Sequence, residues 1–424
     1  MFGFANALLL ALFAAAGVDL VLALRRKAVG QLFTVPHYLF GDWGGEARAR
    51  WGQRAFLLAL MLYEFTVVFC NSMARQNWAW VQGVMSPVLE WLAFLCFGAK
   101  ILFGTRYTWR ELLAGGALYF IARWVYFNSQ NIWWIGIVVA VLAAKDVPLR
   151  RPLQVYFASG CAAMAVVLAL HFAGIVAPDL TSERMGALRG TYGYGHPNTF
   201  GGLVFGLVLA YALLRAQKVR WVDCLLVFAI GVFLLVGPAS RSAALCTLAL
   251  AVGLVFCRLR AGHSVPRWWP GTCAGMVGLT AAVSYLLPLL VIKVGPWNND
   301  IGPAWLAKLD SLLTCRISLT WMAYRLLDVK IAGQVFNWPT VDNSFAFALF
   351  QFGPVVAALL GILFAAALLG HAKQGRRVEV CCLFAMLAYA YMEVQPFHLT
   401  TNPTALLLCG AVFAQTSARW QKIE

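Results

Sequence analysis

The chain has 424 residues, of which 62% are hydrophobic and only 12% are charged, and its formal net charge is +16. Soluble domains carry about twice that charged fraction, and a single apolar core stops growing at roughly 250–300 residues. The composition therefore excludes a soluble globular protein, and because the basic residues form short clusters between apolar blocks rather than one basic face, it predicts no nucleic-acid partner.

The apolar residues form blocks of about 15–25 residues, the length that a helix needs to cross about 30 Å of hydrocarbon. Backbone amides in hydrocarbon must pair within their own segment, and the blocks lack the alternation of barrel strands. We therefore predict an all-α, polytopic membrane protein with about 12–13 transmembrane helices. In chain order, the predicted spans are residues 3–24, 55–73, 82–103, 111–127, 131–144, 153–176, 199–214, 221–236, 242–257, 272–292, 343–369, 379–393 and 404–417.

Lysine and arginine are distributed unevenly between alternate loops. One set of loops holds most of them, and the positive-inside rule assigns that set to the cytoplasm. The N-terminus is then expected outside and the C-terminus inside. The basic loops lie near residues 25–27, 48–54, 106–110, 145–151, 215–220, 258–267, 373–377 and 419–422.

This topology divides the chain into three parts. Residues 1–54 form an N-terminal span with a basic cytoplasmic loop, residues 55–417 form the polytopic membrane domain, and residues 418–424 form a cytoplasmic tail. Two outer segments are long, residues 177–198 and residues 294–342. Within the second, Trp305–Lys330 carries leucines at helical spacing, which predicts an amphipathic helix in the interface plane.

Three arginines lie beside the outer ends of predicted spans, although charge sorting depletes this side. They are Arg189, Arg241 and Arg316. A guanidinium at headgroup depth can bind a diphosphate through two parallel hydrogen bonds. The alternative is that each arginine contacts lipid headgroups or a neighbouring carbonyl.

The segment from Arg189 to Gly202 is rich in glycine and ends where a span begins. His196 stands on the outer face at that helix start, where it can act as a general base or donate a hydrogen bond to a sugar hydroxyl or phosphate. The alternative is that His196 and Asn198 only cap the helix. The residue types leave both interpretations open.

Acidic and amide groups occupy two further positions on this side. Asp342 and Asn343 end the large outer loop, where an acid can cap a helix or orient an acceptor hydroxyl. Glu393 lies at the outer end of its span. Within the spans, an unpaired ionisable group is costly, and we therefore predict that Arg123 pairs with Glu64 or Glu90; a proton pathway is the alternative.

Four outer-face elements in this order resemble the O-antigen polymerase/ligase superfamily, most of all Wzy-type exopolysaccharide repeat-unit polymerases. They are Arg189–Gly202, Pro238–Ala243, Leu309–Trp321 and Val341–Gly353. In the third element, Cys315 stands where the family pattern often has glycine before an arginine. The resemblance covers roughly residues 55–417, as topology and spaced motifs.

The resemblance implies a glycosyltransferase on the outer face of the bacterial cytoplasmic membrane that needs no cofactor or metal. Donor and acceptor would be undecaprenyl-diphosphate-linked oligosaccharides, and a flippase and a chain-length regulator would be partners. Arg189, Arg241 and Arg316 would bind the diphosphate with help from Asn198 and Asn343. His196, Asp342 or Glu393 would activate the acceptor hydroxyl. These roles are those of the family, assigned to the matching positions of this chain.

Three alternatives remain at this stage. A ligase that transfers a finished glycan to another acceptor would share the fold and the arginines. A transporter or flippase of lipid-linked saccharide would have broken helices in matching halves of the chain and a site near the bilayer midplane. A scaffold that holds a partner would need neither the arginines nor a site near the midplane.

Overall fold

A computed structural model describes residues 45–176, 182–184, 187–291 and 302–413. The predicted fold class is confirmed, because the protein is an all-α, polytopic membrane protein. The only strands within these ranges are β1 (Ser182–Arg184) and β2 (Ala187–Arg189), which form a short antiparallel hairpin. The predicted span at residues 3–24 and the tail at residues 418–424 lie outside the described ranges.

Every predicted span from residue 55 onward coincides with at least one helix, and several agree closely at both ends. The apolar length of each block and a proline or polar cap at its start account for these boundaries. The longer helices are α3 (Gly45–Cys70), α5 (Ser86–Phe103), α6 (Trp109–Ser129), α7 (Ile132–Ala143), α8 (Arg150–Phe172), α9 (Pro197–Leu214), α10 (Trp221–Val236), α11 (Arg241–Leu259), α12 (Trp269–Leu286), α16 (Pro354–Lys373) and α17 (Arg377–Met392).

Seven helices of the described chain are long and apolar enough to cross a membrane, and three shorter apolar helices accompany them. The seven are Glu46–Cys70, Val81–Phe103, Arg150–Phe172, Pro197–Leu214, Arg241–Leu259, Trp269–Leu290 and Pro354–Lys373. The shorter three are Ile132–Ala143, Trp221–Val236 and Pro403–Val412. Together they make the protein multi-pass.

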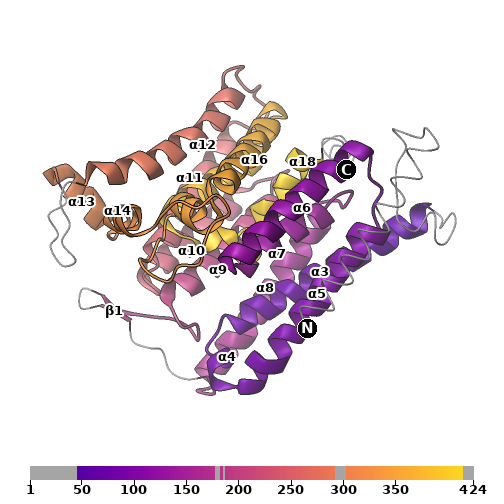
Figure 1. Ribbon diagram of the computed structural model, residues 1–424, viewed down its shortest axis with the longest axis horizontal. Coiled ribbons are helices and arrows are strands. Elements are labelled where there is room, and N and C mark those ends of the chain that lie inside the picture. The colour runs from indigo at the N-terminus through magenta and orange to yellow at the C-terminus, as the bar shows by residue number, and fades with distance from the viewer. Residues whose placement is uncertain (1–44, 177–181, 185–186, 292–301, 414–424) are drawn as a thin grey trace.

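The helices pack as neighbouring pairs (Figure 1). Their buried apolar residues form one large cluster, with two small clusters around α13, α14 and α15. Helix α3 packs against α5 and α8, α10 against α11, α11 against α17, and α12 against α16. Helix α9 is the most buried of the long apolar helices, with 72% of its span inside the protein. Its position in the centre places its first residues among several other helix ends.

The predicted interfacial helix at Trp305–Lys330 is instead two helices, α13 (Ala304–Leu312) and α14 (Arg316–Leu326). Thr314 and Cys315 between them both have a φ of 63°, in the left-handed region that ends a right-handed helix. Figure 1 shows α13 and α14 together at one end of α12. Because of the break, Arg316 is the first residue of a helix.

The predicted pairing of Arg123 is wrong. Its guanidinium lies 4.4 Å from the ring centroid of Phe127, and Glu90 accepts a hydrogen bond of 2.6 Å from Ser86. The Glu64 carboxyl oxygens have no hydrogen-bond partner among the described residues. The reason is geometric, because α6 packs against α7 whereas Glu64 faces α8.

Candidate active site

Polar side chains from five segments meet where α9, α11, α14 and α15 (Ser344–Phe347) begin and α17 ends. We call these residues the Arg–Glu cluster: Arg189, Asn198, Arg316, Asp342 and Glu393. Apart from Arg189 and Asn198, which are nine residues apart, they lie far apart in sequence. Hydrogen bonds or an ion pair connect each to another member. The convergence of predicted functional residues in one place makes the cluster the candidate active site.

Arg316 is the residue with the most contacts in the cluster, and it is only 7% exposed. Its Nη2 donates to Glu393 Oε1 at 2.5 Å and to Ser242 Oγ at 3.3 Å. Its Nη1 donates to the carbonyl of Leu313 at 2.8 Å, and its Nε donates to the carbonyl of Met392. Nε and Nη2 therefore hold the end of α17 against the start of α14, and Nη1 bonds to the turn between α13 and α14.

Glu393 is the acidic centre of the cluster, one residue beyond the end of α17 and 5% exposed. Its Oε1 accepts from Arg316 and, at 3.1 Å, from Asn198 Nδ2. Burial raises the pKa of Glu393 to about 7, an increase that the Arg316 guanidinium opposes. A carboxyl with a pKa close to neutrality can take up and release a proton under physiological conditions.

Arg189 and Asn198 form the second half of the cluster. Arg189 is 6% exposed, and its Nη2 donates to Asn198 Oδ1 at 2.9 Å and to the carbonyl of Ala239 at 3.2 Å. Since Asn198 also donates to Glu393, its amide connects both sides of the cluster. Arg316 thus contacts the Glu393 carboxyl directly, and Asn198 links Arg189 to the same carboxyl.

The start of α14 is fixed by an aspartate from α13. Asp310 is fully buried, and its Oδ1 accepts the backbone N–H groups of Ile317 and Ser318 at 2.7 and 3.2 Å. This is the hydrogen-bond pattern of a helix N-cap supplied from outside the helix. Cys315 precedes Arg316 with a left-handed backbone, a conformation that glycine adopts at no steric cost.

The motif glycines allow α9 to approach the other segments closely. A Cβ at Gly201 would overlap Ser240, and a Cβ at Gly202 would overlap Gln395. Gln395 Nε2 donates to the carbonyl of Asn198 at 3.1 Å, which fixes the first turn of α9. The glycine pair is therefore needed to bring Asn198 within reach of Glu393.

Asp342 and Asn343 lie at the edge of the cluster with different roles. Asp342 Oδ2 is 4.0 Å from Arg316 Nη2, and its side chain is 32% exposed. Asn343 is 4% exposed and accepts the N–H groups of Phe345 and Ala346, so it caps α15. Only Asp342 of this pair presents a polar group to solvent beside the arginine.

Arg241 and His196 are the two predicted residues that the protein leaves exposed. Arg241 is the first residue of α11, next to Ser242, which accepts from Arg316. His196 is the N-cap of α9, and its Nδ1 accepts the N–H of Asn198 at 3.1 Å. Each exposed side chain is therefore within two residues of a side chain that belongs to, or contacts, the buried cluster.

The arrangement suits chemistry on an anionic substrate that comes from the exposed side. An exposed guanidinium and a helix N-terminus attract anions, and a buried carboxyl of near-neutral pKa can accept a proton. Sequence reasoning missed Ser242, Asp310 and Gln395, which position the cluster. Asp310 carried a signal, because a buried acid on an otherwise apolar helix face requires a partner.

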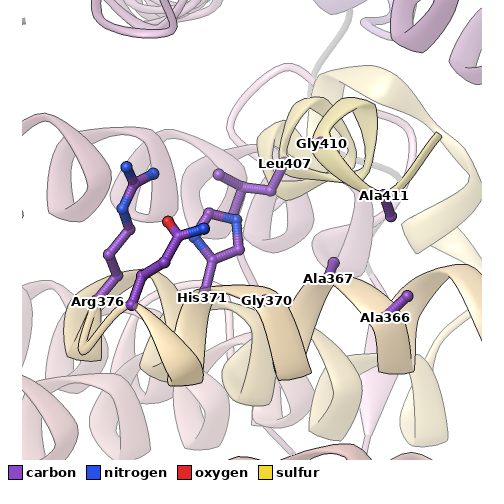
Figure 2. A pocket seen from close by; sticks show the side chains of 9 residues that line it. Ala366, Ala367, Gly370, His371, Arg376, Leu407, Gly410 and Ala411 are labelled. Atoms are coloured by element: carbon purple, nitrogen blue, oxygen red, sulfur yellow. The ribbon is translucent and has the colours of Figure 1, made fainter. Parts of the chain in front are cut away.

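A small cavity lies near the C-terminal end of α16 and contains no residue of the Arg–Glu cluster (Figure 2). Its volume is about 60 Å³, which is below the roughly 300–1,000 Å³ of small-molecule sites. His371 and Arg376 lie at its edge, and small residues form most of its lining. Its size and position separate it from the candidate active site.

Among residues 45–413 as far as they are described, no group of three His, Cys, Asp or Glu side chains is placed to hold a metal ion. No model of a known protein family, no curated protein and no solved structure matches the chain.

Proposed function

We propose that the protein polymerises undecaprenyl-diphosphate-linked oligosaccharide repeat units on the outer face of the bacterial cytoplasmic membrane. The proposal rests on the resemblance of four motifs to the O-antigen polymerase/ligase superfamily and on the convergence of those motifs in the Arg–Glu cluster. The single observation that carries it is the contact of Glu393 with Arg316 and Asn198, at 2.5 and 3.1 Å. These three residues come from three different segments of the chain, two of them in the motifs.

In this mechanism Glu393 is the general base. Its carboxylate accepts the proton of the acceptor hydroxyl as that oxygen attacks the anomeric carbon of the donor. The bond between this carbon and the lipid diphosphate breaks, and the diphosphate leaves with the electron pair. Arg316 and Asn198 hold the carboxylate in place, which is a positioning role.

Arg241 is the diphosphate ligand in this proposal, because it is exposed at the first residue of α11. The leaving group gains negative charge in the transition state, so a guanidinium and a helix N-terminus stabilise it most at that point. Arg189 and Arg316 are buried, unlike Arg241, and are already hydrogen-bonded to protein groups. They contribute positive potential, and either binds phosphate directly only after exchanging a partner.

His196 is exposed at the start of α9, where it contacts the acceptor sugar rather than the buried carboxyl. Its Nδ1 already accepts a backbone N–H, so this nitrogen is not the one that contacts the substrate in the proposal. Replacement by alanine is expected to weaken acceptor binding and to leave part of the activity. Loss of all activity would instead make His196 the base.

The test is genetic and chemical. A strain without the gene is complemented with wild-type protein or with Glu393→Gln, and lipid-linked glycans are extracted and measured by mass spectrometry. A polymerase predicts single repeat units on the lipid diphosphate in the deletion strain and in the variant, and polymer with wild-type protein. Full-length polymer on the lipid diphosphate in the deletion strain would indicate the ligase alternative.

A transporter would give a third result. Single repeat units would then accumulate on the inner leaflet, where an added membrane-impermeant oxidant of sugar diols does not reach them. Polymer of wild-type length in the deletion strain complemented with Glu393→Gln would contradict the proposed mechanism.

A further inference from the structure

Glu64 is a fully buried carboxyl within the apolar helix α3 and is not a member of the Arg–Glu cluster. It lies six residues before Cys70, or about 9 Å along the helix axis from the end of α3. Neither carboxyl oxygen has a hydrogen-bond partner among the described residues. The proposed mechanism does not use this residue.

Among the described residues, no cation is paired with Glu64. The ionisable groups that interact with it electrostatically are Tyr63 on its own helix, Tyr156 and Cys161 on α8, and Tyr194 in the loop before α9. All four are weak acids that are neutral when protonated. No arginine, lysine or histidine of the described chain is paired with the carboxyl.

The contact with α8 also leaves no room for a metal ion. A Cβ built on Gly160 would be 3.0 Å from Glu64 Oε1 and 2.7 Å from Leu207 Cδ2, so the carboxyl packs directly against the glycine. Sodium and similar cations need several oxygen ligands, and no group of three His, Cys, Asp or Glu side chains in the described chain is placed to hold a metal ion. The carboxyl can instead bind a proton.

An ionised carboxylate in such a place costs several kcal/mol or more, because it exchanges water for apolar contacts without compensation. We propose that Glu64 is a proton-binding site in the membrane core, which keeps its proton while α3 and α8 are packed and releases it when they separate. The same free energy couples the two events, so that separation of these helices promotes proton release.

The site lies beneath the loop that leads into the candidate active site. Met73, just after α3, donates its backbone N–H to the carbonyl of Gly193 at 2.9 Å, and Ser72 pairs with Tyr194. A Cβ on Gly193 would lie 3.1 Å from Val167 of α8. Both helices thus contact the loop between Arg189 and His196, and in the proposal this shared contact lets the protonation of Glu64 influence the active site.

Infrared spectroscopy of the purified full-length protein tests the proposal, because a protonated carboxyl and a carboxylate absorb at different frequencies. The wild-type protein is compared with Glu64→Gln at neutral pH, in H₂O and in D₂O. The expected result is the loss of one protonated-carboxyl C=O band that shifts in D₂O. The matched control, Glu46→Gln, removes an exposed acid, 92% exposed at its side chain, and loses carboxylate bands only.

Loss of carboxylate bands in Glu64→Gln would overturn the proposal, since it would mean that Glu64 is ionised. If the glutamine variant does not fold, Glu64→Met provides the same comparison, because a neutral apolar side chain of similar length suits the site. If neither variant folds, the wild-type spectrum at about pH 9 decides, because ordinary carboxyls are ionised there; the absence of any protonated-carboxyl C=O band would overturn the proposal. None of these results depends on glycosyltransferase activity.

Discussion

Replacement of Arg316 by methionine is expected to destabilise the protein in a way that depends on pH. Burial places the pKa of Glu393 at about 7 while Arg316 is present. The folded protein therefore holds a proton on Glu393 that the unfolded chain, with an ordinary carboxyl, has lost. Because the folded state binds the extra proton, stability falls as the pH rises toward 7 and then levels off once Glu393 is ionised beside Arg316.

Without Arg316, Glu393 stays protonated to higher pH, so the decline continues above 7. The difference between wild type and variant then grows by about 1.4 kcal/mol per pH unit, or about 2 kcal/mol at about pH 8.5. A further loss of about 1–3 kcal/mol at every pH is expected, because Ser242 and two partly buried carbonyls lose their donor. The total is a large part of the stability of a typical domain.

Unfolding of the detergent-purified proteins at about pH 6 and about pH 8.5 measures both the pH-dependent and the pH-independent loss of stability. Arg325→Met is the matched control, because Arg325 lies exposed on the same helix and its guanidinium is 5.7 Å from the Trp321 ring centroid. It is expected to change stability by less than about 0.5 kcal/mol at either pH. An Arg316→Met deficit that is equal at both pH values would refute the proposed burial of the Glu393 charge.

Three other substitutions test separate parts of the account. Arg241→Ala should abolish polymer formation with a stability change within about 0.5 kcal/mol, as measured by lipid-linked glycan analysis and thermal unfolding; retained polymer would exclude Arg241 as the diphosphate ligand. Asp310→Ala should cost about 1–2 kcal/mol through loss of the α14 cap, and unchanged unfolding would disprove the capping role. Cys315→Gly should raise stability by up to about 1 kcal/mol, because glycine relieves the left-handed backbone, and a lower melting temperature would contradict this.

Much of the fold follows from the sequence because hydrocarbon imposes simple rules. Helix α10 was predicted at residues 221–236 and has those bounds, since an apolar block between basic loops has one stable arrangement in a bilayer. The position of Pro197 in the first turn of α9 was likewise predictable, because the fixed φ of proline suits that position. The break between α13 and α14 was not predictable, because leucines at helical spacing occur on both sides of Thr314 and Cys315.

The candidate site was only partly predictable. Arg189, Arg316 and Glu393 were selected singly as charges at the outer ends of spans, yet their mutual contacts depend on how distant helices pack. The pairing of Arg123 failed for the same reason, because helical spacing does not reveal which neighbour a helix face meets. The two outcomes differ because the motif glycines at 201 and 202 allow close packing at the cluster, and α6 has no such approach to α3.

The most direct measurement uses the purified protein in proteoliposomes with the lipid-diphosphate-linked repeat units that the deletion strain accumulates. With no nucleotide sugar present, wild-type protein is expected to convert single units into a ladder of longer lipid-linked glycans, resolved by mass spectrometry. The Glu393→Gln variant, folded and equally incorporated, is expected to produce no ladder. A ladder of the same length and rate from Glu393→Gln would contradict the account.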